Sequence, residues 1–473
     1  MNTKRWTLTV VSIATAMLML DIAVVNTALP RIGEDLHAGL SGLQWVVDAY
    51  TLALASTVLT AGVLADRLGR HRVFAVGLVV FTLSSLAAAL AGSIEVLNTA
   101  RAVQGVGGAI LFAVSLALLA QAFPGQRERA GALAVYGATI GASFAVGPLV
   151  GGLLTSGIDW QWVFLINIPI GIYALWVTLT KVEESRDPSP RRIDWLGQVT
   201  LTAGLGLLVL GLLRGNEDGW TSTPIVAELG GAVALLAAFV LIESRVREPM
   251  LPLRLFRRPS FTGAQIAAFS ISASMFAVYI YLTLYLQGVL GLSAIEAGLT
   301  MLPGTVVNFA VAGATAQIME RGVRPGALVS AGLALTAAGM VLMTLAGVES
   351  SWVTMLPGML VGMTGVGLFN PAVIAIALDG IPESQSGLAA GVNDTARQAG
   401  IAVGVAGLGA LIPAGSALGG SPTEYVNGLH DALLAGAGLA AVGAVATALL
   451  FGLRRSRARS ASGVRPELAV EST

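Results

Sequence analysis

Long apolar segments recur along almost the whole chain, and short polar segments separate them. Because an α-helix rises about 1.5 Å per residue, roughly 20 apolar residues cross the hydrocarbon core of a bilayer. The segments are continuously apolar and lack the period-two alternation of a transmembrane β-barrel. The pattern predicts an all-α polytopic membrane protein with fourteen spans, at 6–29, 43–65, 73–93, 96–122, 131–155, 161–180, 194–213, 224–243, 262–288, 296–319, 326–346, 352–376, 386–412 and 430–453.

The composition supports this interpretation and excludes several kinds of site. Of the 473 residues, 55% are apolar and only 11% are charged, too few charges to cover a soluble protein of this length. The absence of cysteine excludes disulfides, thiolate metal sites and thiol catalysis, and three scattered histidines do not form a metal cluster. We therefore expect no metal and no cofactor. The first apolar run continues to Leu29 without a small-residue cleavage site, which favours a retained helix over a signal peptide.

The basic residues are distributed unequally between the loops. If the N-terminus is inside, 23 of the 27 lysines and arginines lie in inner segments and only Arg31 and Arg214 lie in outer loops. This asymmetry follows the positive-inside rule for an even number of helices with both termini cytoplasmic. We expect a monomer whose partners are the bilayer, protons and a small amphipathic substrate, and no nucleic acid.

A weak internal repeat suggests two related halves. The loop Gly62–Arg72 (GVLADRLGRHR) is echoed by Gly313–Arg324 (GATAQIMERGVR), where Gln317 replaces the aspartate. Such repeats are typical of transporter halves, although chance similarity among apolar helices also explains them. The predicted organisation is a six-helix bundle over residues 1–183, two inserted helices within 184–258, a second six-helix bundle over 259–453, and a disordered cytoplasmic tail over 454–473.

Two ionisable residues lie at comparable depth in neighbouring spans. Asp21 lies about 12 Å below the outer end of the first span, and Arg101 lies about 8 Å below the outer end of the fourth. Ionisable groups inside a bilayer are costly and usually face a cavity or a partner. The two side chains can therefore pair, either as a proton-coupling site or as a structural salt bridge.

Other polar residues in the spans are weaker candidates. Asp48 lies about one turn inside the second span, where it suits a second proton site or an interfacial anchor. Glu228 in the inserted pair can extend its carboxylate to the interface. Asp394 and Arg397, three residues apart in the segment NDTARQ, form either a local neutral pair or a polar cavity wall. The remaining candidates for the wall of a substrate cavity are Asn26, Tyr50, Gln104, Asn370 and Asn393.

Two glycine-rich segments suggest conformational roles. In the loop Gly62–Arg72, Asp66 can cap a neighbouring helix or pair with Arg70, so the loop is either a charged latch or only a topology signal. The other latch candidates are Gly62, Arg67, Gly69 and Arg72. The fifth span contains GATIGASFAVGPLVGG, whose small residues allow close helix packing and whose proline permits a kink. Its key positions are Gly141, Gly147, Pro148, Gly151 and Gly152.

These motifs together resemble the fourteen-helix drug–proton antiporter family of the major facilitator superfamily. The segments that carry the resemblance are the loop and the fifth-span run just described, Leu20–Pro30 (LDIAVVNTALP), Arg101–Gly107 (RAVQGVG) and Trp160–Gly171 (WQWVFLINIPIG). The resemblance implies the major facilitator fold, proton coupling through Asp21 and Arg101, and a fifth span that seals the membrane leak path. It also implies that the Asp66 latch stabilises an outward-facing state.

The sequence therefore predicts proton-coupled efflux of small amphipathic drugs or antibiotics across a bacterial cytoplasmic membrane. Import or facilitated transport of a metabolite, lipid or peptide by the same scaffold is the alternative. A membrane enzyme or sensor is disfavoured, because the chain has no HExxH motif, nucleotide-binding loop or soluble domain. The two-half repeat favours a carrier over a channel.

Overall fold

The computed structural model describes residues 3–186, 193–379, 381, 386–413, 415–417 and 419–462, and these residues form helices with no strand among them. The predicted all-α architecture is confirmed. The helices are α1 (Thr3–Asp35), α2 (Leu40–Leu68), α3 (Arg70–Ala89), α4 (Ile94–Ala122), α5 (Gln126–Gly157), α6 (Trp162–Leu165), α7 (Asn167–Lys181), α8 (Trp195–Asp218), α9 (Thr223–Arg245), η1 (Leu253–Arg257), α10 (Pro259–Ile271), η2 (Ser272–Phe276), α11 (Ala277–Leu284), η3 (Tyr285–Val289), α12 (Ala294–Glu320), α13 (Pro325–Met343), η4 (Trp352–Met355), α14 (Leu356–Leu378), α15 (Ser386–Gly409) and α16 (Pro422–Ser462).

Each predicted span corresponds to one helix or to consecutive helices, with three differences in detail. The segment 161–180 is broken into α6 and α7 at Ile166. The segment 262–288 contains two π-helical turns, η2 before α11 and η3 after it. Finally, α16 continues to Ser462, into the segment 454–473 that the sequence predicts to be a disordered tail. The rest of that predicted tail, 463–473, lies outside the described residues.

Among the described residues, twelve helices are long and apolar enough to cross a membrane. The two halves of α5, Gly131–Ser143 and Val146–Gly157, form a bent pair that adds a thirteenth candidate. Helix α15 is not among these candidates, although it corresponds to the thirteenth predicted span. The count of fourteen crossings and the cytoplasmic location of both termini therefore stay predictions.

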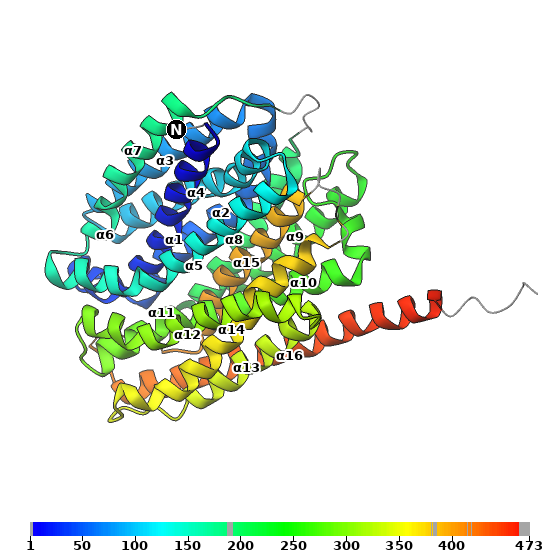
Figure 1. The fold of residues 1–473 in the computed structure, drawn as a ribbon. Helices are drawn as coiled ribbons and strands as arrows, with labels where there is room; N and C mark the ends of the chain where they lie inside the picture. The colour runs from blue at the N-terminus through cyan, green and yellow to red at the C-terminus, as the bar shows by residue number, and fades with distance from the viewer. Residues whose placement is uncertain are drawn as a thin grey trace, which may run out of the picture.

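The helices pack in two groups that meet along two seams (Figure 1). In the N-terminal group, α2 and α3 pack on α4, α1 packs on α5, and α3 packs on α7. In the C-terminal group, α13 packs on α14 and α16, α12 packs on α14, and α10 packs on α15 and α16. The contacts between the groups are made mainly by α2 with α15 and by α5 with α12. We call these the α2/α15 seam and the α5/α12 seam.

The hairpin of α8 and α9 covers the α2/α15 seam. Helix α8 contacts both α2 and α15, and Val209 and Leu213 of α8 pack with Ala402 and Ala406 of α15. Polar contacts bind α8 to both sides, because Thr60 of α2 donates a hydrogen bond to Gln198 and Asn216 donates one to the carbonyl oxygen of Ala410. The inserted helices are therefore a brace across one seam.

Candidate functional site

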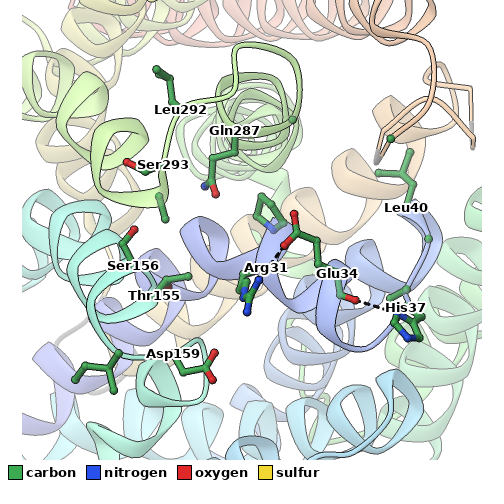
Figure 2. Close-up of a pocket in the computed structure, with 18 of the residues that line it drawn as sticks. Arg31, Glu34, His37, Leu40, Thr155, Ser156, Asp159, Gln287, Leu292 and Ser293 are labelled. Atoms are coloured by element: carbon green, nitrogen blue, oxygen red, sulfur yellow. Dashed lines mark hydrogen bonds and ion pairs between the residues drawn. The ribbon is translucent and has the colours of Figure 1, made fainter.

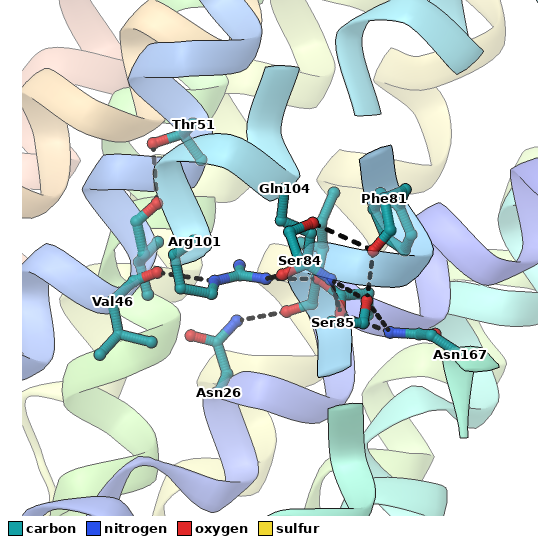
Figure 3. A network of polar contacts seen from close by, with 12 residues as sticks. Asn26, Val46, Thr51, Phe81, Ser84, Ser85, Arg101, Gln104 and Asn167 are labelled. Carbon is teal, nitrogen blue, oxygen red and sulfur yellow. Dashed lines mark hydrogen bonds and ion pairs between the residues drawn. The ribbon is translucent and has the colours of Figure 1, made fainter. Parts of the chain in front are cut away.

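A buried polar network surrounds Asp21 in the N-terminal group. Figure 3 labels its members Ser85, Arg101, Gln104 and Asn167. Nη1 of Arg101 lies 2.6 Å from Oδ2 of Asp21, and the two side chains are 2% and 0% exposed. Oδ1 of Asp21 accepts hydrogen bonds from Nε2 of Gln104 at 2.8 Å and from Nδ2 of Asn167 at 2.9 Å. Ser85 accepts from Gln104 at 2.9 Å and from Asn167 at 3.4 Å. Four helices, α1, α3, α4 and α7, thus contribute to one site.

Arg101 is held on its other sides as well. Its Nε donates to the carbonyl oxygen of Val46 at 3.0 Å, and Nη1 also donates to Oε1 of Gln104 at 2.7 Å. The guanidinium carbon lies 4.3 Å from the centre of the Tyr50 ring and 5.9 Å from that of Phe164. A cation this well desolvated gains from both the carboxylate and the ring faces. The pair has little freedom to move while the carboxylate is charged.

The sequence places Asp21 and Arg101 at similar depth, and the structure brings them into contact. Sequence reasoning indicates Gln104 only as a cavity residue, whereas in the structure it bridges both charges. Sequence reasoning misses Ser85 and Asn167. Asn167 carries a signal that could have found it, since an amide inside an apolar span needs a partner. Ser85 carries none, because a serine in a helix commonly bonds its own backbone, as Ser85 also does to Phe81 at 2.8 Å.

Asp48 lies on α2 and is completely buried, with no hydrogen-bond partner for either carboxylate oxygen in the described structure. An isolated ionised carboxylate in an apolar interior is far more costly than a neutral carboxyl group. This environment therefore suits an acid that carries a proton in the conformation observed here. It does not suit the interfacial anchor that the sequence leaves open, which would be exposed to water.

The charges of the two candidates on α15 interact with each other, but in the described structure they make no close ion pair. Among the described residues, no ion pair within 4 Å joins Asp394 to Arg397. The guanidinium of Arg397 instead lies 5.7 Å from the centre of the Phe276 ring. Asp394 is 6% exposed, on a helix that packs against α2 of the N-terminal group.

The remaining cavity candidates are dispersed. Nδ2 of Asn393 donates to Oε1 of Gln265 on α10 at 3.2 Å. Nδ2 of Asn26 donates to the carbonyl oxygen of Ile22 in its own helix at 2.9 Å. Asn370 lies on α14 with an amide oxygen that has no partner in the described structure. Glu228 on α9 pairs with Arg214 at 2.6 Å, which places it in the hairpin and away from the interface.

The loop between α2 and α3 makes one expected contact and one unexpected contact. Asp66 pairs with Arg70, with Oδ1 lying 2.8 Å from Nη2. Glu184, in the segment that leads from α7 toward the hairpin, lies across the loop. It accepts a hydrogen bond from the backbone N–H of His71 at 3.2 Å and lies 3.4 Å from Nε of Arg72. The loop is thus joined to the connection that precedes the inserted helices.

Gly69 adopts a positive-φ backbone conformation in this loop. Its φ is +112°, a conformation that residues with a Cβ rarely adopt, and a Cβ there would lie 2.6 Å from the Glu184 carboxylate. Gly62, by contrast, is helical, and a Cβ there would meet only Ala113, at 3.9 Å. Arg67 is exposed. Of the predicted latch residues, Gly69 alone has a backbone geometry that requires glycine.

The glycine and proline run of α5 contacts two different helices. Gly147 and Gly151 lie against α1, where added Cβ atoms would collide with Ala23 and Thr27. Pro148 and Gly152 lie against α12, where a Cβ at Gly152 would lie 2.5 Å from the carbonyl oxygen of Ala294. Gly141 is close to α12 as well, since a Cβ added to it would lie 3.5 Å from Cδ2 of Phe309. These small residues let three helices approach closely at the predicted outer end.

A cavity of about 1010 Å³ is hollowed into the predicted outer face (Figure 2). Polar side chains at the ends of α1, α5 and α12 line it, among them Arg31, Glu34, Asp159 and Ser293. On one side, Nε2 of Gln287 donates to the carbonyl oxygen of Thr27 at 2.9 Å, a bond that joins the two helix groups. The sequence does not predict this cavity, because its residues come from loops and helix ends that are distant along the chain.

Comparison with known proteins finds relatives that are named for drug resistance or antibiotic export. The Major Facilitator Superfamily matches residues 11–405. The chain is 35% identical over 414 residues to multidrug resistance protein Stp of Mycobacterium tuberculosis, covering 87% of this chain and 76% of that protein. It is 36% identical to cephamycin export protein CmcT of Amycolatopsis lactamdurans, covering 93% and 91%. It is also 34% identical to a methylenomycin A resistance protein of Streptomyces coelicolor, covering 85% of each chain.

Solved structures share the fold at low identity. A peptide transporter, POT, solved with sulfate, matches with a TM-score of 0.69 at 14% identity, covering 95% of this chain and 94% of that one. The human organic anion transporter MFSD10 matches with a TM-score of 0.65 at 15% identity, covering 94% and 99%. At this identity the likeness concerns the arrangement of helices alone.

We predict that Asn167→Leu destabilises the protein by about 1–2 kcal/mol, because Asp21 loses a donor that no water replaces. Asn26→Leu is the matched control and should cost less, since it removes only a bond within its own helix. Thermal unfolding of the purified protein in detergent measures both. Equal losses for the two variants would contradict a stabilising role for Asn167 in the network.

We also predict that Gly69→Ala destabilises the loop by about 1–3 kcal/mol, because alanine is strained at φ +112° and its methyl meets Glu184. Gly62→Ala should be neutral or slightly stabilising, because alanine is favoured in a helix. The readout is the same thermal unfolding experiment. A Gly69→Ala protein as stable as Gly62→Ala would show that the loop does not hold this geometry in solution.

Proposed function

Since this chain belongs to the Major Facilitator Superfamily, we propose that it exports small amphipathic drugs or antibiotics in exchange for protons. As a multi-span member it lies in the cytoplasmic membrane, and its family and relatives are transporters. Those relatives are named for multidrug resistance, cephamycin export and methylenomycin A resistance. The observation that carries the proposal is the buried Asp21 network, a titratable carboxylate held inside the membrane domain by Arg101, Gln104 and Asn167.

The proton acts by changing the charge of this network. While Asp21 is ionised, its attraction to Arg101 fixes α1 against α4. When a proton from the outside neutralises Asp21, the guanidinium loses its counter-charge and must find other partners, such as the Tyr50 ring. A buried cation without its counter-ion is costly, so the helices around it change their preferred arrangement. Proton binding is thereby coupled to alternating access.

Two further acids, Asp48 and Asp394, are candidates for binding a proton or a cationic substrate. Asp48, buried without a partner for its carboxylate in the described structure, is a second proton site. Tyr50 belongs to the Asp21 network, because its ring lies against Arg101. Asp394, buried on α15 of the second half, is the candidate acid for binding a cationic substrate. Asn26, Asn370, Asn393 and Arg397 remain candidates for the wall of the substrate cavity.

The moving parts follow the packing of the helices. Residues 1–183 and 259–453 form the two six-helix bundles that rock against each other, and 184–258 holds the inserted hairpin. The Asp66–Arg70 pair and Gly69 act as a latch at the predicted cytoplasmic side of the N-terminal bundle. Transport needs no cofactor, because the proton gradient supplies the energy.

We predict that Asp21→Asn abolishes proton-driven efflux while the protein still inserts and folds. The amide keeps the size of the side chain but cannot exchange a proton or balance Arg101. Ethidium efflux from energised inverted vesicles, with and without a proton uncoupler, measures the effect. The control is Asp431→Asn, the same chemical change at an exposed aspartate of α16.

The control should transport as the unmodified protein does, and the uncoupler should stop both. Undiminished uphill efflux by Asp21→Asn would refute the coupling role. Ethidium movement by the unmodified protein that ignores the uncoupler would favour a facilitated carrier instead.

A further inference from the structure

Two carboxyl groups lie at the base of the inserted hairpin, away from the Asp21 network and from the motifs of the chain. Asp194 directly precedes α8, and Glu243 lies near the end of α9. Because α8 and α9 pack against each other, both residues lie at the predicted inner end of the hairpin. Glu243 is 3% exposed, so a negative charge on it would be held almost entirely out of water.

Each carboxyl group uses one oxygen to bind a backbone N–H group. Oδ1 of Asp194 accepts a hydrogen bond from the N–H of Gly197 at 2.8 Å, which caps the start of α8. Oε2 of Glu243 accepts one from the N–H of Leu251 at 2.9 Å, in the segment that leads from α9 to η1. The two acids therefore hold the start of α8 and the connection to the second helix bundle.

The other two oxygens approach each other. Oδ2 of Asp194 and Oε1 of Glu243 are buried, and no N–H or hydroxyl group of the described structure donates to either. Both lie beside Gly197, since a Cβ added there would be 2.9 Å from Oδ2 and 2.6 Å from Oε1. Across this glycine the two carboxyl groups interact directly, side chain to side chain. A residue larger than glycine would force them apart.

Among the described residues, no basic side chain lies within 4 Å of either carboxyl group. Helix α8 packs on α2 and α15. At the inner end of α2, Asp66 is paired with Arg70. Helix α15 packs on α8 through Ala402 and Ala406, in the outer half, and its charged residues are Asp394 and Arg397. The other charged side chains of the adjoining segments are exposed, namely Arg67, Arg245, Arg247, Glu248 and Arg254.

The contact between the two acids requires something positive between their free oxygens. Two ionised carboxylates at this distance repel each other, whereas one shared proton turns the repulsion into a hydrogen bond. A calcium or magnesium ion takes about six or more oxygen ligands, and the site offers two free ones. A proton needs only those two.

We propose that Asp194 and Glu243 form a proton-binding site, separate from Asp21, which closes the base of the inserted hairpin while it holds its proton. The site goes beyond the proposed export and does not depend on it. Its location on the inner side follows from the orientation that the basic residues predict.

Loss of the proton adds a second charge to the pair, and the repulsion releases the start of α8 from the end of α9. One turn into α8, Gln198 accepts a hydrogen bond from Thr60 of α2. A movement of the start of α8 therefore loosens the brace across the α2/α15 seam. The hairpin thus responds to the pH on the predicted inner side.

The first test detects the proton by infrared spectroscopy of the purified protein. In Glu243→Gln and Asp194→Asn the new amide donates to the remaining carboxylate, so both variants keep the hydrogen bond without a proton. We expect the unmodified protein at about pH 7 to show a protonated-carboxyl C=O band that both variants lack. Glu349→Gln, the same change at an exposed glutamate, should keep that band. Equal bands in all four proteins would overturn the site.

The second test measures the pH dependence of stability. In the unfolded chain the two carboxyl groups are apart and ionised above about pH 5, so the folded protein binds one more proton. Its stability therefore falls as the pH rises and the pair loses that proton. Between about pH 6 and pH 9, we expect the melting temperature of the unmodified protein and of Glu349→Gln to fall about 2–4 °C more than that of Glu243→Gln.

An equal fall in Glu243→Gln would overturn the proposal. Added sodium or magnesium chloride, at constant pH and ionic strength, provides a further comparison. Stabilisation of the unmodified protein but not of Glu243→Gln by either salt would show that a metal cation holds the pair, which also overturns the proton site.

The third test follows the base of the hairpin itself. Because the chain contains no cysteine, Leu68→Cys at the end of α2 and Trp195→Cys at the start of α8 can carry spin labels. These positions are 53% and 64% exposed. We expect the distance between the labels to lengthen from about pH 6 to about pH 9, and to stay constant when Glu243→Gln is added. No change in either protein, or the same change in both, would overturn the release of the hairpin.

Discussion

The burial of one negative charge constrains the N-terminal half of this protein more than any other single interaction. The Asp21 side chain is 0% exposed, so its charge is matched by Arg101 and by amide donors within the protein. Those donors come from α4 and α7, and α3 supplies Ser85 behind them. A movement of any of these helices therefore changes the ion pair or the hydrogen bonds of the Asp21 carboxylate. This buried carboxylate is the group on which the proposed proton coupling rests.

The glycine and proline run of α5 has two physical effects, close packing and bending of the helix. Its glycines bring α5 into contact with α1 and α12 at the predicted outer end. Its proline removes a backbone hydrogen bond one turn earlier, near the 42° bend between the two halves of the helix. Close packing and a bend therefore arise from one short segment. At the α2/α15 seam, the inserted hairpin adds contacts over two helices that already pack directly against each other.

The charged loop shows how a recognisable motif acquires contacts that the motif does not contain. Asp66 and Arg70 are one helical turn apart, and their pairing follows from that spacing alone. Glu184 lies more than a hundred residues further along the chain and still reaches His71 and Arg72, because α7 ends beside the start of α3. The loop is thus linked to the segment that leads to the hairpin, so a movement of one displaces the other.

The sequence by itself determined the all-helical membrane fold and the position of each long apolar helix, because hydrophobic length and helix rise act locally. It also identified the superfamily from its motifs. Only the tertiary structure decided which side chains share a site. The roles of Ser85 and Asn167 and the packing of the hairpin over one seam depend on how distant helices are rotated and bent against each other. Apolar periodicity carries little of that information, because a lipid-facing surface and a helix-facing surface are equally apolar.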